Sequence, residues 1–333
     1  MLNNFNLINV LSVFRHQSRT YLFFVFLSFT FWAIFILAPI QNLIHQHRIH
    51  KMLAEATPKE QEYLKNFFKY TFFLSYFGYT IFGDKPVSFE TINLNRKLEL
   101  PETADYMDIL HIFDKYKLKE CWQAWEKFSH NLNLKKFTIS SYKSSLDKNY
   151  LEFMIINHEA FKKVVKDNIQ DFHKVLGSSF TPDQILDEYR KGSGEIFNLI
   201  RNHDALFGIL LGYGKLNAWE YMRCGGGENM NVSFAYDQTQ TDTSRILKLY
   251  FCVLANTKET SDLRIAYEKQ RQEINKIYQS ENFLELLLLK LTGGYSLFFQ
   301  PTTLLKEIWA VIHIIFAICL ALILFSSHIF SLT

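Results

Sequence analysis

The sequence predicts a membrane protein in which two terminal transmembrane helices flank a mainly α, α+β domain with a small antiparallel sheet. Two long runs without charged residues lie near the ends of the 333-residue chain. Between them, apolar residues recur mostly at helical spacing, and one pair of alternating runs is typical of a β-hairpin. We therefore expect a tail (residues 1–20), a first span (21–40), a central domain (41–306), a second span (307–330) and a short tail (331–333).

The composition excludes several classes of protein. With 48% hydrophobic and 21% charged residues and only 13 Gly and 6 Pro, the chain is neither disordered nor collagen-like. The formal net charge of +3 gives no field that would attract nucleic acid, so no nucleic-acid partner is expected. Four widely spaced cysteines fit neither a disulfide framework nor a zinc ribbon.

The two apolar runs are long enough to cross a bilayer. Tyr21 to Ile40 is twenty residues without a charge, and Ile308 to Phe325 is eighteen. A helix needs about 20 residues to cross the hydrocarbon core. Burial inside a soluble core is the alternative. The first run is too long for a cleaved signal and lacks a cleavage motif, which favours a retained anchor.

Basic residues near the spans favour a cytoplasmic central domain. Two flank the first span on the tail side, Arg15 and Arg19. Five lie on the domain side of the spans, namely Arg48, Lys51, Lys59, Lys290 and Lys306. The positive-inside rule then places the central domain in the cytoplasm.

The first half of the central domain begins with a capping box. Thr57, Pro58 and Glu60 predict a helix start. The apolar stretch 71–83 is too short to cross a bilayer, so we expect an interfacial or core segment. A turn at 83–86 precedes an expected edge strand at 87–94, and residues 104–132 have helical spacing.

A predicted hairpin and several helices follow. Residues 137–142 and 150–156 flank a polar turn. Asn157 caps an amphipathic helix that Gly177 stops, and Thr181 opens a second capping box whose helix ends at Gly192. Further on we expect a strand at 231–236, a buried strand or short helix at 246–255, and helices at 261–279 and 283–291.

Glycine is concentrated in one region, with nine of the 13 between positions 177 and 227. The segment 208–215 (GILLGYGK) partly resembles a phosphate loop. However, five residues rather than four separate Gly208 from Gly214, and Leu216 replaces the metal-binding hydroxyl. Tight helix packing or a helix-to-helix turn is favoured, and a ligand role for Gly212, Gly214 and Asn217 is the alternative.

The histidines do not form a recognisable metal site. His45, His47 and His50 follow the first span without a nearby cysteine, which favours a polar collar beside an anionic leaflet. The triplets 157–159 (NHE) and 202–204 (NHD) are interpreted as helix starts with Asn as the cap. No cofactor or metal is expected.

Two stretches together are similar to a known family. Residues 72–90 (FFLSYFGYTIFGDKPVSFE) and 206–223 (LFGILLGYGKLNAWEYMR) resemble uncharacterised membrane proteins present in multiple copies in chlamydia-type intracellular bacteria. The resemblance implies a bacterial envelope or host-interaction setting. That family has no established activity, so it supplies no catalytic residue. Inclusion-membrane proteins of such bacteria have closely paired apolar segments, whereas here about 265 residues separate them.

These observations favour a binding or scaffold domain at the membrane surface, with membrane lipids and a protein partner or a second copy of the chain as partners. The alternative is a membrane-bound enzyme that acts on a lipid or peptide through residues 204–227. It requires Asp204, Asn217, Arg223 and the nucleophile candidate Cys224 to converge in one pocket. The ligand-binding candidates are Asp204, Gly212, Gly214, Asn217 and Arg223.

Overall fold

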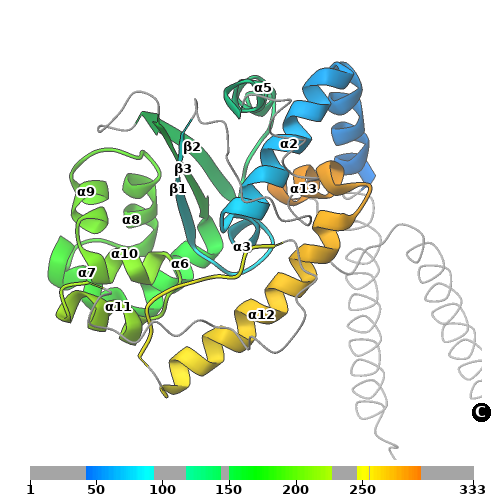
Figure 1. The fold of residues 1–333 in the computed structure, drawn as a ribbon. Helices are drawn as coiled ribbons and strands as arrows, with labels where there is room; N and C mark the ends of the chain where they lie inside the picture. The colour runs from blue at the N-terminus through cyan, green and yellow to red at the C-terminus, as the bar shows by residue number, and fades with distance from the viewer. Residues whose placement is uncertain (1–42, 94–117, 144–149, 227–245, 255, 294–333) are drawn as a thin grey trace, which may run out of the picture. The chain divides into compact units, whose positions relative to one another are not determined.

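The computed structural model describes residues 43–93, 118–143, 150–226, 246–254 and 256–293 (Figure 1). The two predicted spans and the strand expected at 231–236 lie outside these residues. Among the helices that are described, none combines the length and apolar character needed to cross a membrane. The described part is a mainly helical domain with a small antiparallel sheet, which confirms that part of the predicted fold class.

The sheet has three strands in the order β1-β3-β2, and both pairs are antiparallel. β2 (Phe137–Lys143) and β3 (Tyr150–Asn157) form the predicted hairpin. β1 (Val87–Asn93) lies at the edge, as expected, and pairs with β3. Residues 152–156 of the central strand are all buried, because helices cover both faces of the sheet.

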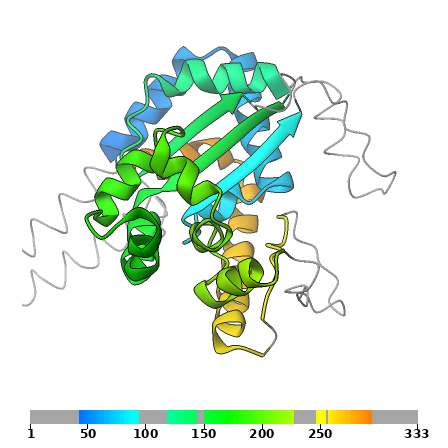
Figure 2. The same ribbon diagram turned by 90° about the vertical axis from the view of Figure 1, so that its left-hand side faces the viewer.

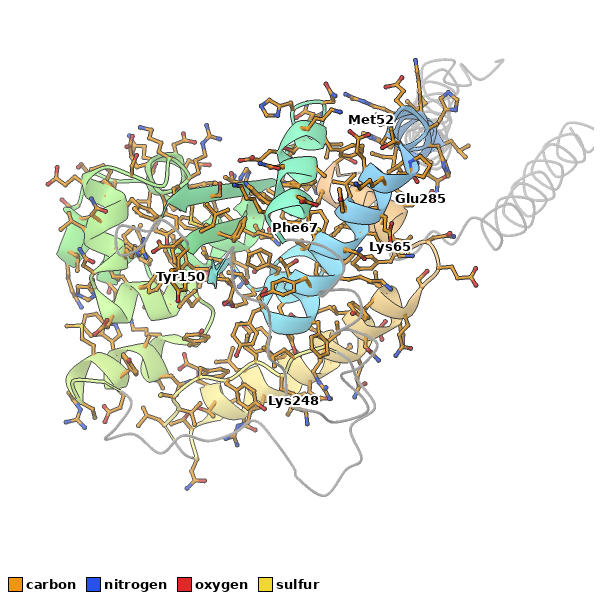
Figure 3. All side chains as sticks on the ribbon, turned by 45° about the horizontal axis from the view of Figure 1, so that its top comes forward. Met52, Lys65, Phe67, Tyr150, Lys248 and Glu285 are labelled. Atoms are coloured by element: carbon orange, nitrogen blue, oxygen red, sulfur yellow. The ribbon has the colours of Figure 1, made fainter. Side chains whose placement is uncertain are left out.

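One face of the sheet is covered by α2 (Pro58–Leu74), α3 (Phe77–Ile81) and α5 (Leu118–Ser129). Aromatic rings join these layers. Trp122 of α5 lies 4.5 Å from the Phe153 ring of β3, and Phe67 of α2 lies 5.4 Å from Trp122 (Figure 3 labels Phe67).

The predicted capping box at Thr57 is present at the start of α2. Every residue of α3 is buried, so the apolar stretch 71–83 is a core segment.

The other face is covered by six short helices, seen from their own side in Figure 2. They are α6 (His158–Asp167), α7 (Ile169–Leu176), α8 (Pro182–Tyr189), α9 (Glu195–Arg201), α10 (Asp204–Leu210) and α11 (Lys215–Arg223). Their buried side chains, including Phe161, Tyr189 and Leu206, pack with Met154 and Ile156 of β3 in one apolar cluster. The sheet is therefore the middle layer between two groups of helices.

The helix boundaries at Asn168 and His203 differ from the sequence prediction. The helix expected from Asn157 to Gly177 is two helices, because Asn168 leaves helical geometry at φ −120° and its amide donates to the Val164 carbonyl. Asn157 does cap α6, and Gly177 ends α7. The cap of α10 is His203 rather than Asn202: the His203 ring accepts from the Leu206 amide at 3.3 Å, and Asn202 ends α9.

The last part of the domain contains α12 (Lys258–Gln279) and α13 (Phe283–Leu291). α12 begins three residues earlier than predicted, because Thr257 caps it through the Thr260 amide. Residues 246–254 form neither the expected strand nor a helix. Side chains rather than a neighbouring strand hold this segment: Asn217 accepts from the Leu254 amide at 2.8 Å, and the Tyr76 hydroxyl accepts from the Tyr250 amide at 3.2 Å.

Candidate functional site

The glycine-rich segment is a helix–turn–helix. α10 and α11 are joined by the turn 211–214 and lie against each other (Figure 1). Their packing is close, since a Cβ added to Gly208 would lie 2.9 Å from the Ala218 Cβ. Gly212 and Gly214 adopt left-handed conformations, with φ of 76° and 88°, which side chains disfavour. The turn therefore needs glycine at positions 212 and 214 for its backbone path. α10 needs glycine at position 208 for the close approach of α11.

Three consecutive carbonyls of this turn accept hydrogen bonds from side chains of other segments. The bonds run from the Lys85 Nζ to Leu211 (2.5 Å), from the Tyr267 Oη to Gly212 (2.7 Å) and from the Asn217 Nδ2 to Tyr213 (2.8 Å). The donors belong to the turn before β1, to α12 and to α11. The backbone path of the turn is thus fixed from three directions.

The amides that follow the turn are occupied by a carboxylate of the protein. Glu259 of α12 accepts from the Lys215 amide at 2.9 Å and from the Leu216 amide at 2.8 Å. Bound phosphate uses such helix-terminal amides in phosphate loops. The Lys215 ammonium lies 2.6 Å from an oxygen of Asp171. A phosphate at this turn would therefore have to displace Glu259 and compete with Asp171.

Lys85 lies in the turn that the sequence predicts at 83–86, and no sequence pattern marks it as a buried charged group. Its side chain is fully buried, and its Nζ also donates to the Val87 carbonyl at 2.7 Å. The Tyr213 ring centre lies 5.2 Å from the same nitrogen. Burial lowers the pKa of Lys85 to about 7, against the attraction of Glu90. Burial likewise raises the pKa of Glu90 to about 7, against the attraction of Lys85.

A cavity of about 480 Å³ opens beside the turn. Its lining comes from the end of α9, from α10, from the turn, from α11 and from the segment before α12. The lining residues are Arg201, Asn202, Asp204, Phe207, Gly208, Leu211, Tyr213, Asn217, Ala218, Tyr221, Phe251 and Cys252. Its volume falls in the range of about 300–1,000 Å³ typical of small-molecule sites.

The cavity wall combines aromatic rings with a few charged groups. Tyr213 and Phe251 are stacked, with ring centres 5.1 Å apart and planes within 8°. The Arg201 guanidinium lies 4.3 Å from the Phe89 ring centre and donates to Glu152 at 2.8 Å. Glu152 thus balances the charge of Arg201. Asp204 is exposed in the first turn of α10, where the helix dipole favours a carboxylate.

Two of the predicted site residues line this cavity and the others do not. Asp204 and Asn217 are part of its wall, whereas Gly212, Gly214 and Arg223 are not. The Asn217 amide oxygen already accepts from the Leu254 amide (2.8 Å) and from the Thr260 hydroxyl (3.0 Å). Its position in the wall is therefore that of a connector between α11 and α12.

Arg223 and Cys224 lie away from the cavity, at the end of α11. The Arg223 guanidinium donates to Glu220 on the same helix at 2.8 Å, and the Arg223 side chain is 71% exposed. Burial and the nearby Glu220 carboxylate raise the pKa of the Cys224 thiol. A raised pKa leaves less thiolate and so a weaker nucleophile. The predicted convergence of four residues therefore occurs only for Asp204 and Asn217.

No local sequence pattern identifies Arg201, Cys252 or the aromatic wall as site residues, because the fold brings them together from separate segments. Within the described ranges, no cluster of three or more His, Cys, Asp or Glu could hold a metal ion. Of the three histidines that follow the predicted first span, His50 lies 3.1 Å from Glu285 of α13.

Comparison with known proteins returns no match: no protein-family model, no curated protein and no solved structure is significantly similar to this chain.

Proposed function

We propose that this protein is a membrane-anchored binding protein whose cavity between α10, α11 and residues 251–252 holds a small amphipathic ligand. The main support for this proposal is the cavity itself. Its volume is about 480 Å³, and its wall contains four aromatic residues, Phe207, Tyr213, Tyr221 and Phe251. Aromatic and aliphatic surface would supply most of the binding free energy. Arg201, Asn202 and Asp204 would orient the polar end of the ligand.

The membrane part of the proposal rests on the sequence. Residues 21–40 and 308–325 would anchor the domain as two helices, with lipids as the surrounding partner. The basic residues beside them would keep the domain in the cytoplasm. The anchored domain would then present its cavity to a ligand or a protein partner close to the bilayer, or to a second copy of the chain.

Binding is favoured over catalysis because the polar groups around the glycine-rich turn already serve the fold. Asn217 connects two segments, Glu259 occupies the α11 amides, and Arg223 pairs with Glu220. The raised pKa of Cys224 argues against a thiolate nucleophile at the end of α11. The enzyme alternative on a lipid or peptide substrate would have to use the groups inside the cavity instead.

Cys252 offers a direct test of ligand binding, because it lines the cavity and is only partly buried. In the full chain in nanodiscs, the rate of maleimide modification of Cys252 is measured by peptide mass spectrometry. The probes are anilinonaphthalene sulfonate, dodecanoate and dodecylamine. A bound probe at ten times its Kd leaves about a tenth of the cavities empty, so we expect about tenfold slower modification.

Cys224 is the internal control, since it lies outside the cavity lining. Leu211→Trp should fill the cavity and abolish the protection, whereas Leu216→Trp, on the exposed side of α11, should preserve it. Equal modification rates at Cys252 with and without all three probes would contradict the ligand proposal. The anchoring is tested separately: the chain should stay in the membrane pellet after alkaline carbonate washing, and release into the supernatant contradicts it.

A further inference from the structure

The two ends of the described chain lie at the same corner of the domain. The helix at residues 43–55 packs beside α13, and the His50 ring lies 3.1 Å from Glu285 (Figure 3 labels Met52 and Glu285 there). His45 near the start and Thr292 at the end line one cleft. Residue 43 follows the first predicted span by three positions, and residue 293 precedes the second by 14 positions. The described part of the domain therefore begins and ends at this corner, and the first proposed anchor lies just before it in the sequence.

The cleft at this corner has a volume of about 70 Å³, enough for a phosphate-sized group. Arg48 and Lys135 line it from two segments far apart in the sequence, together with His45, Asn133 and Thr292. Arg48 and Lys135 are both exposed. Guanidinium and ammonium groups are the groups that bind phosphate oxygens in proteins, and the Asn133 side chain adds an amide beside them. The Thr292 hydroxyl is engaged, since it donates to the Leu288 carbonyl at 2.8 Å.

More positive charge surrounds the cleft. A Cβ added to Gly293 would lie 4.0 Å from the Lys136 side chain, so this lysine adjoins the end of the domain. Burial and the positive charge of Lys136 lower the pKa of Lys290 in the last turn of α13. Two acidic groups near the cleft pair with residues other than Arg48 and Lys135: Glu159 lies 3.3 Å from Lys136, and Glu285 lies 3.1 Å from His50. The corner thus concentrates cations from three segments.

We propose that this cleft binds the phosphate of an anionic phospholipid headgroup. The proposal rests on the membrane anchoring proposed above. Apolar side chains adjoin the cations: Leu43 and Ile44 are 57% and 62% exposed at the start of the same helix that carries Arg48. In a membrane, exposed apolar residues lie in the hydrocarbon layer, and basic residues one or two helical turns away reach the headgroup layer. Leu43, Ile44 and Arg48 follow this order. This order favours a lipid over free phosphate.

The test uses the full chain, purified in detergent from mixed phosphatidylglycerol and phosphatidylcholine vesicles, with native mass spectrometry of the lipids that it retains. Wild type should retain phosphatidylglycerol in preference to phosphatidylcholine. Arg48→Gln with Lys135→Gln should reduce that preference at least about fivefold. Lys258→Gln with Lys269→Gln, the same charge change on exposed positions of α12, should leave it unchanged.

Three results would overturn the lipid site: no preference in wild type, equal loss of preference in both double variants, or displacement of the lipid by millimolar inorganic phosphate at low detergent. The last result identifies a free-phosphate site. A chain that leaves the membrane pellet on carbonate washing refutes the anchoring and the lipid site together. A chain that stays in the pellet without lipid preference refutes the lipid site alone.

Discussion

Lys85 shows how a single residue can connect distant parts of the domain. Its ammonium group contacts the Val87 carbonyl at the start of β1 and the Leu211 carbonyl in the glycine-rich turn. A buried ammonium group costs free energy unless its hydrogen-bonding groups find partners. Two carbonyls and the Tyr213 ring supply them here. The residue therefore links the edge strand to the wall of the cavity.

The pH dependence of unfolding should reveal Lys85. Its pKa is about 7 in the folded chain against an ordinary value of 10.5, so the unfolded chain binds more protons between these values. The unfolding free energy therefore gains a contribution that rises with pH from about 7 towards 10. The raised pKa of Glu90 affects the pH dependence of stability only below about pH 7. There, the contribution of Glu90 to the unfolding free energy falls as pH rises. We expect Lys85→Met to flatten the rise between pH 7.5 and 9.5 in urea unfolding.

Lys258→Met is the matched control, because Lys258 is exposed on α12. The unfolding free energy of Lys258→Met should rise between pH 7.5 and 9.5 as that of the wild type does. A wild-type slope in Lys85→Met would show that Lys85 keeps its ordinary pKa in the folded chain.

At the scale of elements, α11 depends on a residue of another helix for its start. Gly214 precedes α11 and has no side chain to cap it, so Glu259 of α12 supplies the acceptor oxygens. This arrangement explains why the local sequence resembles a phosphate loop without matching it. The glycines create the same exposed amides, and the anion that they bind is part of the chain.

Glu259→Ala should therefore destabilise the domain by about 1–2 kcal/mol, the usual cost of losing a helix cap. Glu273→Ala is the control, since Glu273 pairs with Lys276 on the surface of α12. Exposed pairs of this kind contribute about 0–1 kcal/mol. Urea unfolding of both variants measures the difference. Equal, small losses would show that the α11 amides do not need the carboxylate.

Elements with local signals could be predicted from the sequence, and elements defined by distant contacts could not. The Thr57 and Thr181 capping boxes and the β2–β3 hairpin are encoded within a few residues, and all three are present. The irregular segment 246–254 depends on Asn217 and Tyr76, which are far away in the sequence. The His203 cap and the break at Asn168 use contacts three and four residues away, but a histidine cap and a mid-helix asparagine are not among the usual boundary signals. The cavity lining also depends on distant contacts, so the sequence predicts only Asp204 and Asn217 among its residues.

At the scale of the whole described domain, β3 is the shared support of both helical layers. Phe153 projects to one side, against Phe67 and Trp122, and Met154 projects to the other, into the cluster of Phe161 and Leu206. Because successive side chains of a strand point to opposite faces, one strand serves two cores. Damage to this strand should therefore affect both layers.

Phe153→Ala should cost about 3–5 kcal/mol, as expected for removing a buried aromatic side chain. Tyr150→Ala, at the exposed start of the same strand, should cost about 0.5 kcal/mol or less. Thermal or urea unfolding monitored by tryptophan fluorescence and by circular dichroism tests this expectation. Independent transitions by the two probes would show that the two layers do not unfold together.

The adjacency of residues 43–50 with 285–293 has a mechanical consequence. A pull on either flanking segment enters the fold at one corner, where the His50–Glu285 pair and the packing of α13 on α2 carry the load. The cavity lies on the opposite face of the sheet, away from that route. Tension along the flanking segments would act on the contact between the helix at residues 43–55 and α13, so occupancy of the proposed ligand site should be insensitive to stretching of the proposed anchors.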